Sequence, residues 1–130
     1  MRIDVHAHYW TEDYLDLLVD LGKADAIAAR GIGAGPGADL EARLRLMDRA
    51  GVEMQVLSAC PQLPYAEDGK KATTAARFVN DQYAELVQAY KDRFRAFAAL
   101  PMPHVEESVG ETGRVLDELG DLALVLDPGG

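Results

Sequence analysis

The residues best suited to chemistry lie at the start of the chain, in the segment MRIDVHAHYW. His6 and His8 are one residue apart, and the chain contains only one further histidine, His104. Residues i and i+2 of a β-strand point to the same side of a sheet, so a strand here would hold two imidazoles side by side. Imidazole nitrogens bind divalent cations such as zinc at about 2.0–2.1 Å. The spacing predicts half of a metal site, although two strand histidines bonded to backbone or water would show the same pattern.

The strand that must position these imidazoles is expected over residues 2–7, with the two histidines near its C-terminal end. Strict alternation places Asp4 on the same side as His6 and His8, and the apolar residues of the strand on the other side. A carboxylate at this position could orient a metal-binding histidine or bond to neighbouring backbone. We favour a supporting role for Asp4 over direct metal binding.

Composition limits the classes of protein to be considered. The chain has 130 residues, of which 48% are apolar and 27% charged, values typical of one globular domain. The net charge of −9 argues against a nucleic-acid-binding surface. No apolar run is long enough to cross a membrane, no signal peptide is evident, and the single cysteine, Cys60, cannot form an internal disulfide. A soluble, cytoplasmic protein that binds neither nucleic acid nor membrane is expected.

Further along the chain, short apolar runs alternate with segments of helical periodicity, which predicts an α/β fold with parallel strands. Strands are expected at residues 2–7, 52–59, 94–100 and 121–126, and helices at about 40–50, 74–91 and 106–119 and after Thr11, which could cap the first helix. Asp39 could cap the helix at 40–50, and Gly51 is expected to end it. The glycine-rich stretch 31–39 lacks the Gly-Lys-Ser/Thr of a phosphate-binding loop and is interpreted as a plain loop. Four β/α steps correspond to half of an eight-stranded barrel, which normally needs about 250 residues.

Several motifs occur together in a recognisable order. The stretches RIDVHAHYW, ARLRLMDRAGVEMQVLSACP and YKDRFRAFAALPMP resemble the amidohydrolase-related family, near the branch of the 2-amino-3-carboxymuconate-6-semialdehyde and benzoate-type decarboxylases. Each motif alone is weak, but the His-x-His strand, the MD-x-x-GV helix end, the QVLS strand and the DRF…LP strand are specific in combination. The resemblance implies the N-terminal half of a (β/α)8 TIM-type barrel, forming one partial domain over residues 1–130.

The same resemblance implies a divalent metal, usually zinc, held by His6 and His8. The family's other ligands, a histidine from a middle strand and an aspartate from the last one, would lie beyond Gly130. Arg43 falls near an arginine that some members use to hold a substrate carboxylate, and the guanidinium fork matches a carboxylate. The alternative for Arg43, which we favour from sequence, is a solvated position on a helix face.

Other candidate residues carry weaker signals. Cys60 is expected near the mouth of the barrel, where a buried, unreactive thiol is the commoner outcome. His104 is interpreted as a surface histidine. Asp127 is the one later carboxylate expected on the same face, but the DLALVLDPGG segment departs from the family's usual strand at this point.

Two neutral imidazoles leave a divalent ion short of ligands, because a catalytic zinc normally has three from protein. Metal binding by the isolated chain is therefore expected to be weak or absent. The sequence predicts a truncated or partial family member that, if completed, is a decarboxylase of a small unsaturated or aromatic carboxylic acid, with its catalytic acid or base unassigned. The alternatives are a metal-dependent hydrolase and a non-catalytic, self-associating half-barrel. A homo-oligomer is expected, because two half-barrels about a two-fold axis could bring His6 and His8 of both copies together.

Overall fold

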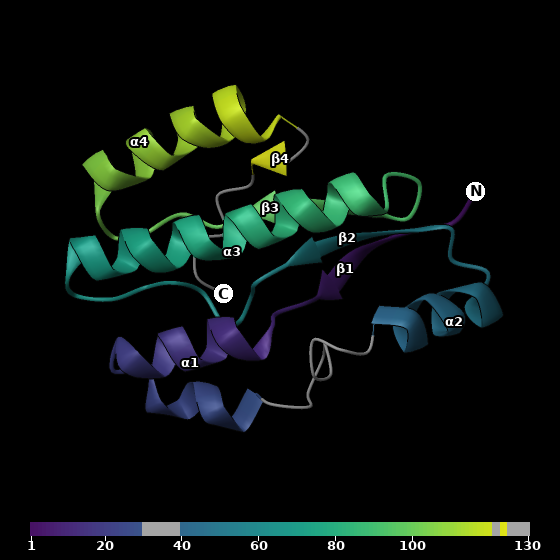
Figure 1. Ribbon diagram of the computed structural model, residues 1–130, viewed down its shortest axis with the longest axis horizontal. Coiled ribbons are helices and arrows are strands. Elements are labelled where there is room, and N and C mark those ends of the chain that lie inside the picture. The colour runs from purple at the N-terminus through teal and green to yellow at the C-terminus, as the bar shows by residue number, and fades with distance from the viewer. Residues whose placement is uncertain (30–39, 121–122, 125–130) are drawn as a thin grey trace.

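The computed structural model describes residues 1–29, 40–120 and 123–124 (Figure 1). Its strands are β1 (Ile3–His8), β2 (Met54–Ser58), β3 (Phe94–Ala98) and β4 (Ala123–Leu124). They are parallel and lie in the order β1-β2-β3-β4, which is the order that successive β/α units produce. The prediction of a parallel α/β fold is confirmed. Most of the strand expected at 121–126 lies outside the described residues.

Helices connect the strands. They are α1 (Glu12–Asp20), the 3-10 helix η1 (Ala24–Ala29), α2 (Leu40–Ala50), α3 (Gly69–Ala89), α4 (Val105–Arg114) and the π-helical turn η3 (Val115–Leu119). The predicted cap of α1 is confirmed, because the Thr11 side chain accepts a hydrogen bond from the backbone N–H of Tyr14. Gly51 follows α2 with a φ of 68°, as a left-handed C-terminal residue should. The glycine-rich stretch 31–39, with Asp39 as the expected cap of α2, lies outside the described residues.

Helix α3 begins earlier than predicted. The periodicity indicated a start near Thr74, whereas the helix begins at Gly69. Asp68 explains the difference, because its carboxylate accepts hydrogen bonds from the backbone N–H groups of Lys70 and Lys71. These bonds lower the pKa of Asp68. Because of this first turn, the loop after β2 runs from the end of that strand to the capped start of α3.

The helices bury one face of the sheet more completely than the other. Alternate residues of β2 and β3, such as Leu57, Phe94 and Ala96, are completely buried on the side of the helices. In β3 the residues between them are less covered, and Arg95 is exposed. In Figure 1, α3 lies along the sheet with α1 and α4 beside it, in agreement with its contacts to β3 and to both helices. None of the helices in the described ranges is long and apolar enough to cross a bilayer.

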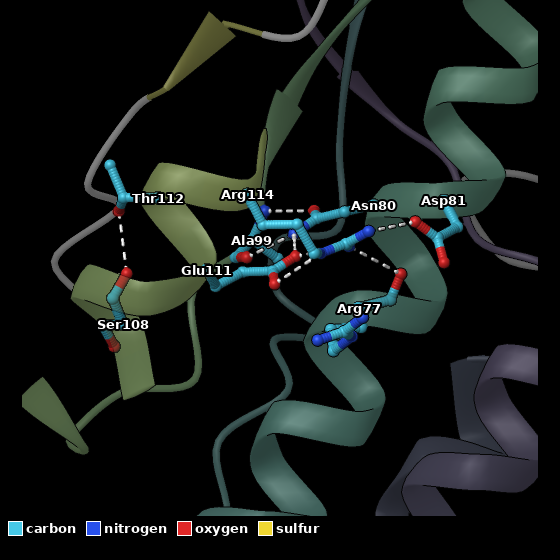
Figure 2. A network of polar contacts seen from close by, with 8 residues as sticks. All are labelled: Arg77, Asn80, Asp81, Ala99, Ser108, Glu111, Thr112 and Arg114. Carbon is cyan, nitrogen blue, oxygen red and sulfur yellow. Dashed lines mark hydrogen bonds and ion pairs between the residues drawn. The ribbon is translucent and has the colours of Figure 1, made fainter. Parts of the chain in front are cut away.

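A buried network, formed by Asn80, Glu111 and Arg114, fixes α3 and α4 against the end of β3 (Figure 2). The Asn80 amide donates to the carbonyl of Ala99 at 2.9 Å and accepts from its N–H at 2.7 Å, so it pairs with this backbone unit on both sides. It also donates to Glu111 Oε1 at 2.9 Å. Arg114 neutralises the Glu111 carboxylate at 2.7 Å and reaches Asp81 at the same distance. The end of β3 is thereby held by side chains from two helices.

Candidate metal and substrate site

His6 and His8 lie at the C-terminal end of β1, as the sequence predicts. Their ring centroids are 4.8 Å apart and the rings meet edge to face, with an angle of 80° between their planes. Both side chains line a cavity of about 240 Å³ formed at the ends of β1, β2 and β3. The two imidazoles are therefore adjacent and open onto one space, which is the arrangement that a shared cation requires.

The cavity has mainly apolar walls. Its larger apolar residues include Leu63 from the loop after β2, and Phe97, Leu100 and Met102 from β3 and the segment after it. Polar groups are contributed by Ser58, Cys60 and Tyr65. A small organic molecule with a polar end directed at the histidines would match this distribution.

One imidazole nitrogen in this site is conspicuous. Nδ1 of His8 is shielded from solvent and has no hydrogen-bond partner among the described residues. A buried polar atom without a partner is costly, so a cation or a group from outside the described residues would stabilise this ring. Together with the adjacent His6 ring, this nitrogen makes the pair fit part of a metal site. Within the described part of the chain, no cluster of three potential ligands completes it.

The position of Asp4 corrects the prediction from strict alternation. Asp4 pairs in register with Gln55, but Ala7 pairs with Leu57, so β1 has one extra residue in this interval and forms a β-bulge. The bulge reverses the alternation between Asp4 and the histidines. Asp4 accepts a hydrogen bond from the Gln55 side chain at 3.1 Å and lies on the helix-covered side, away from the cavity. It does not share a face with His6 and His8.

Arg43 approaches the site from the side of the sheet opposite the cavity. From α2, its guanidinium donates to the backbone carbonyl of His8 at 2.8 Å and to Oε1 of Gln55 at 3.0 Å. Its central carbon lies 5.4 Å from the centre of the Tyr9 ring, a cation–π distance. Burial lowers the pKa of Arg43, and the neighbouring Tyr9, Tyr83 and Asp4 oppose this effect. The solvated position favoured from sequence is wrong. Arg43 is not among the residues that line the cavity, and its substrate-binding role stays a prediction.

Two side chains that the sequence did not single out hold the cavity's loop wall. The Tyr14 hydroxyl donates to the carbonyl of Gln62 at 2.6 Å, and Nζ of Lys23 donates to the carbonyl of Leu63 at 2.7 Å. Burial raises the pKa of Tyr14 and lowers that of Lys23. Both contacts join residues 40 or more positions apart, so no local pattern indicates them.

The remaining candidates fall into three positions. His104 is half-buried rather than a free surface residue, and its Nε2 lies 2.7 Å from the carbonyl of Ala66, to which it must donate. Cys60 lines the cavity mouth and is half-buried. Asp127 lies outside the described residues.

Known proteins share this architecture. A family model described as amidohydrolase matches residues 3–130. Gamma-resorcylate decarboxylase of Polaromonas sp. (strain JS666) is 43% identical over 79 residues, which cover 60% of this chain and 24% of that protein. 2-Amino-3-carboxymuconate-6-semialdehyde decarboxylase of Dictyostelium discoideum is 34% identical over 83 residues, covering 63% and 23%.

A solved structure extends the similarity to nearly the whole chain. The dihydroxybenzoic acid decarboxylase of Polaromonas sp. JS666, with bound manganese and the inhibitor 2-nitroresorcinol, superposes with a TM-score of 0.73 at 33% identity. The superposition covers 95% of this chain and 37% of that one. The chain thus matches about a quarter of the length of these curated relatives and little more than a third of the solved structure.

Proposed function

The chain belongs to the amidohydrolase family, and we propose that it provides the metal-binding strand and part of the substrate cavity of a decarboxylase for a small aromatic or unsaturated carboxylic acid. Its fold is the N-terminal half of a (β/α)8 barrel, as predicted, and solved family members cover 95% of the chain. The observation that carries the proposal is the pair of adjacent imidazoles opening onto an apolar cavity at the C-terminal ends of the strands.

In this proposal His6 and His8 hold a divalent cation, either manganese, as bound in the solved relative, or zinc. The cation, when bound, supplies Lewis-acid polarisation of a substrate oxygen. The chain's own residues would supply part of the substrate contacts. Phe97 and Leu63 would pack against an unsaturated or aromatic ring and exclude water, while the Tyr65 side chain offers a polar contact beside the cavity. During decarboxylation the carbon–carbon bond to the carboxylate breaks, carbon dioxide leaves, and a proton is added to the ring carbon.

Metal titration tests the site directly. The full chain is titrated with Mn²⁺ and Zn²⁺ by equilibrium dialysis with elemental analysis, beside a His6→Ala/His8→Ala variant. We expect weak binding by the native chain and none at this site in the variant, because both nitrogen donors are removed. His104→Gln is the matched control, since it removes a histidine that lies outside the cavity lining. Equal binding by the native chain and the double variant would contradict the proposal.

Activity is tested with 2,6-dihydroxybenzoate, the compound bound in another solved family decarboxylase. Release of carbon dioxide that depends on added Mn²⁺ and is lost in the double variant would support decarboxylation. Metal-dependent hydrolysis is the alternative within the family. Turnover of ester or amide substrates without carbon dioxide release would favour it.

Self-association is a second candidate function, supported by exposed apolar side chains in the edge strand β1, one of which, Val5, lines the cavity. Ile3 and Val5 in the edge strand β1 are 46% and 65% exposed, which is unusual for apolar residues of a parallel strand. A second copy would cover them and could add its own His6 and His8 to the site. We expect sedimentation to show a dimer that Val5→Asp dissociates, with one metal ion bound per two chains. A monomeric native chain would rule this arrangement out.

A further inference from the structure

We propose that Arg43, Gln55 and Asp4 form a backing network that positions His6 and His8 from the opposite side of the sheet. This role rests on the proposed metal site at the two histidines. It assigns Arg43 a positioning function through the backbone of the metal-binding strand, in place of contact with substrate.

The network is continuous from one histidine to the other. Arg43 donates to the carbonyl of His8 at 2.8 Å and to Oε1 of Gln55 at 3.0 Å. The Gln55 amide donates a hydrogen bond to Oδ2 of Asp4 at 3.1 Å. Oδ1 of Asp4 accepts a hydrogen bond from the backbone N–H of His6 at 3.0 Å. Each end of the network therefore binds the peptide backbone of one proposed ligand.

The bulge explains why side chains are needed there. Regular pairing between β1 and β2 is interrupted between Asp4 and Ala7, and β1 has no neighbour on its other side within the described ranges. A bulged edge strand is the part of a sheet that ladder hydrogen bonds define least. The backing network spans this interval, because it fixes the N–H of His6 and the carbonyl of His8. The backing network thus holds β1 in the interval where its regular hydrogen bonds to β2 are interrupted.

The residue types suit this task. The planar fork of Arg43 can serve two acceptors on two strands at once, which the single ammonium of a lysine does less well. Gln55 carries both an acceptor and a donor, so it can link the guanidinium to the Asp4 carboxylate. The Tyr9 ring, 5.4 Å away, supports the guanidinium and limits its movement. All three members of the network are half-buried, and the bonds that Arg43 and Gln55 donate are partly shielded from solvent, whereas the bond from the His6 N–H to Asp4 is exposed.

Positioning of this kind has a measurable consequence for metal affinity. Loss of groups that orient metal ligands typically weakens binding 10–100-fold. We therefore expect Arg43→Met to raise the Mn²⁺ dissociation constant of the full chain about tenfold or more, and Arg43→Lys to raise it several-fold. Arg45→Met is the matched control, because Arg45 lies on the same helix with an exposed side chain that pairs with the exposed Glu41. It should change the constant less than twofold.

The sign of the effect separates positioning from charge. Removing a positive charge near a cation site would by itself strengthen cation binding. Weaker binding by Arg43→Met can therefore not come from the lost charge, and Arg43→Lys retains the charge altogether. An unchanged dissociation constant combined with a higher KM for 2,6-dihydroxybenzoate would show that Arg43 contacts substrate, and would overturn the proposal.

A second measurement needs no metal. Amide hydrogen exchange of the metal-free chain, followed by NMR, reports directly on the His6 N–H that Asp4 binds. Asp4→Ala should accelerate exchange at His6 about tenfold, while Asp92→Ala, an exposed control, should leave it unchanged. Unaltered exchange in Asp4→Ala would overturn the backing network. If the native chain binds no metal, the proposed function fails, and this exchange experiment still decides whether the network holds the strand.

Discussion

Two polar networks flank the cavity, and they differ in burial and in what they hold. The buried network lies at the end of β3, with Asn80 0% and Glu111 3% exposed, and it fixes one backbone unit and two helices. The backing network lies at the edge strand, its members are half-buried, and it fixes the backbone of the two histidines. The first network is placed where a broken bond is most costly, and the second where strand geometry is least defined.

This difference separates stability from site geometry. A polar atom that loses its partner in a dry interior keeps its full desolvation cost, whereas a half-exposed one regains water. The buried network should therefore control the free energy of unfolding, and the backing network the placement of the imidazoles. Variants in each network can test the division.

The largest effect is expected for Arg114→Met. The variant leaves the buried Glu111 carboxylate without its cation, and breaking a buried pair in this way costs about 3 kcal/mol. Urea unfolding followed by circular dichroism measures the loss. The double variant Glu111→Leu/Arg114→Met should regain part of it, because no isolated charge remains. A loss below about 1 kcal/mol in the single variant would show that the carboxylate finds another partner.

Asn80→Ala should have the next largest effect. The substitution leaves the N–H and the carbonyl of Ala99 without their side-chain partner in a buried position, at a cost of about 2 kcal/mol. The same unfolding experiment measures it, with Gln88→Ala on the exposed side of α3 as the control. Faster amide exchange at Ala99 should accompany the loss. Equal stability of the two variants would contradict the role given to Asn80.

The sequence predicted the parts of the fold that depend on local patterns. Apolar runs located the strands, and Thr11 and Gly51 marked helix ends because their side chain or backbone acts within a few residues. The start of α3 was misplaced, since Asp68 caps a polar first turn that periodicity does not distinguish from loop. The family resemblance supplied the half-barrel, which the length of the chain alone could only suggest.

The candidate site was predicted less completely. His6 and His8 were recognisable from their spacing. The bulge adds one residue to β1 and turns Asp4 to the other face, and nothing in the alternation of apolar and polar residues in the sequence indicates it. Arg43 could not be placed, because its acceptors are a carbonyl 35 residues away and a side chain on the next strand. Contacts of this kind are set by how α2 packs on the sheet and not by local sequence.

In the backing network, Arg43→Met should affect stability less than either buried variant. The hydrogen bonds that Arg43 donates to His8 and Gln55 join half-buried groups that water can reach after the substitution, so a loss of about 1 kcal/mol is expected. Urea unfolding of the metal-free chain measures it beside Arg45→Met, which should be within about 0.5 kcal/mol of the native chain. A loss as large as that of Arg114→Met would show that the backing network supports the core, and the division between the two networks would fail.

The smallest expected effect is the coupling between the networks. They share no residue, and they connect different elements: α2, β1 and β2 in one case and α3, α4 and the end of β3 in the other. Losses from independent sites add within about 0.5 kcal/mol, so the Arg43→Met/Arg114→Met double variant should unfold with the sum of the two single losses. A coupling above about 1 kcal/mol would mean that the end of β3 and the histidine strand move together. In that event the buried network would also position the imidazoles, and Arg114→Met alone would weaken Mn²⁺ binding.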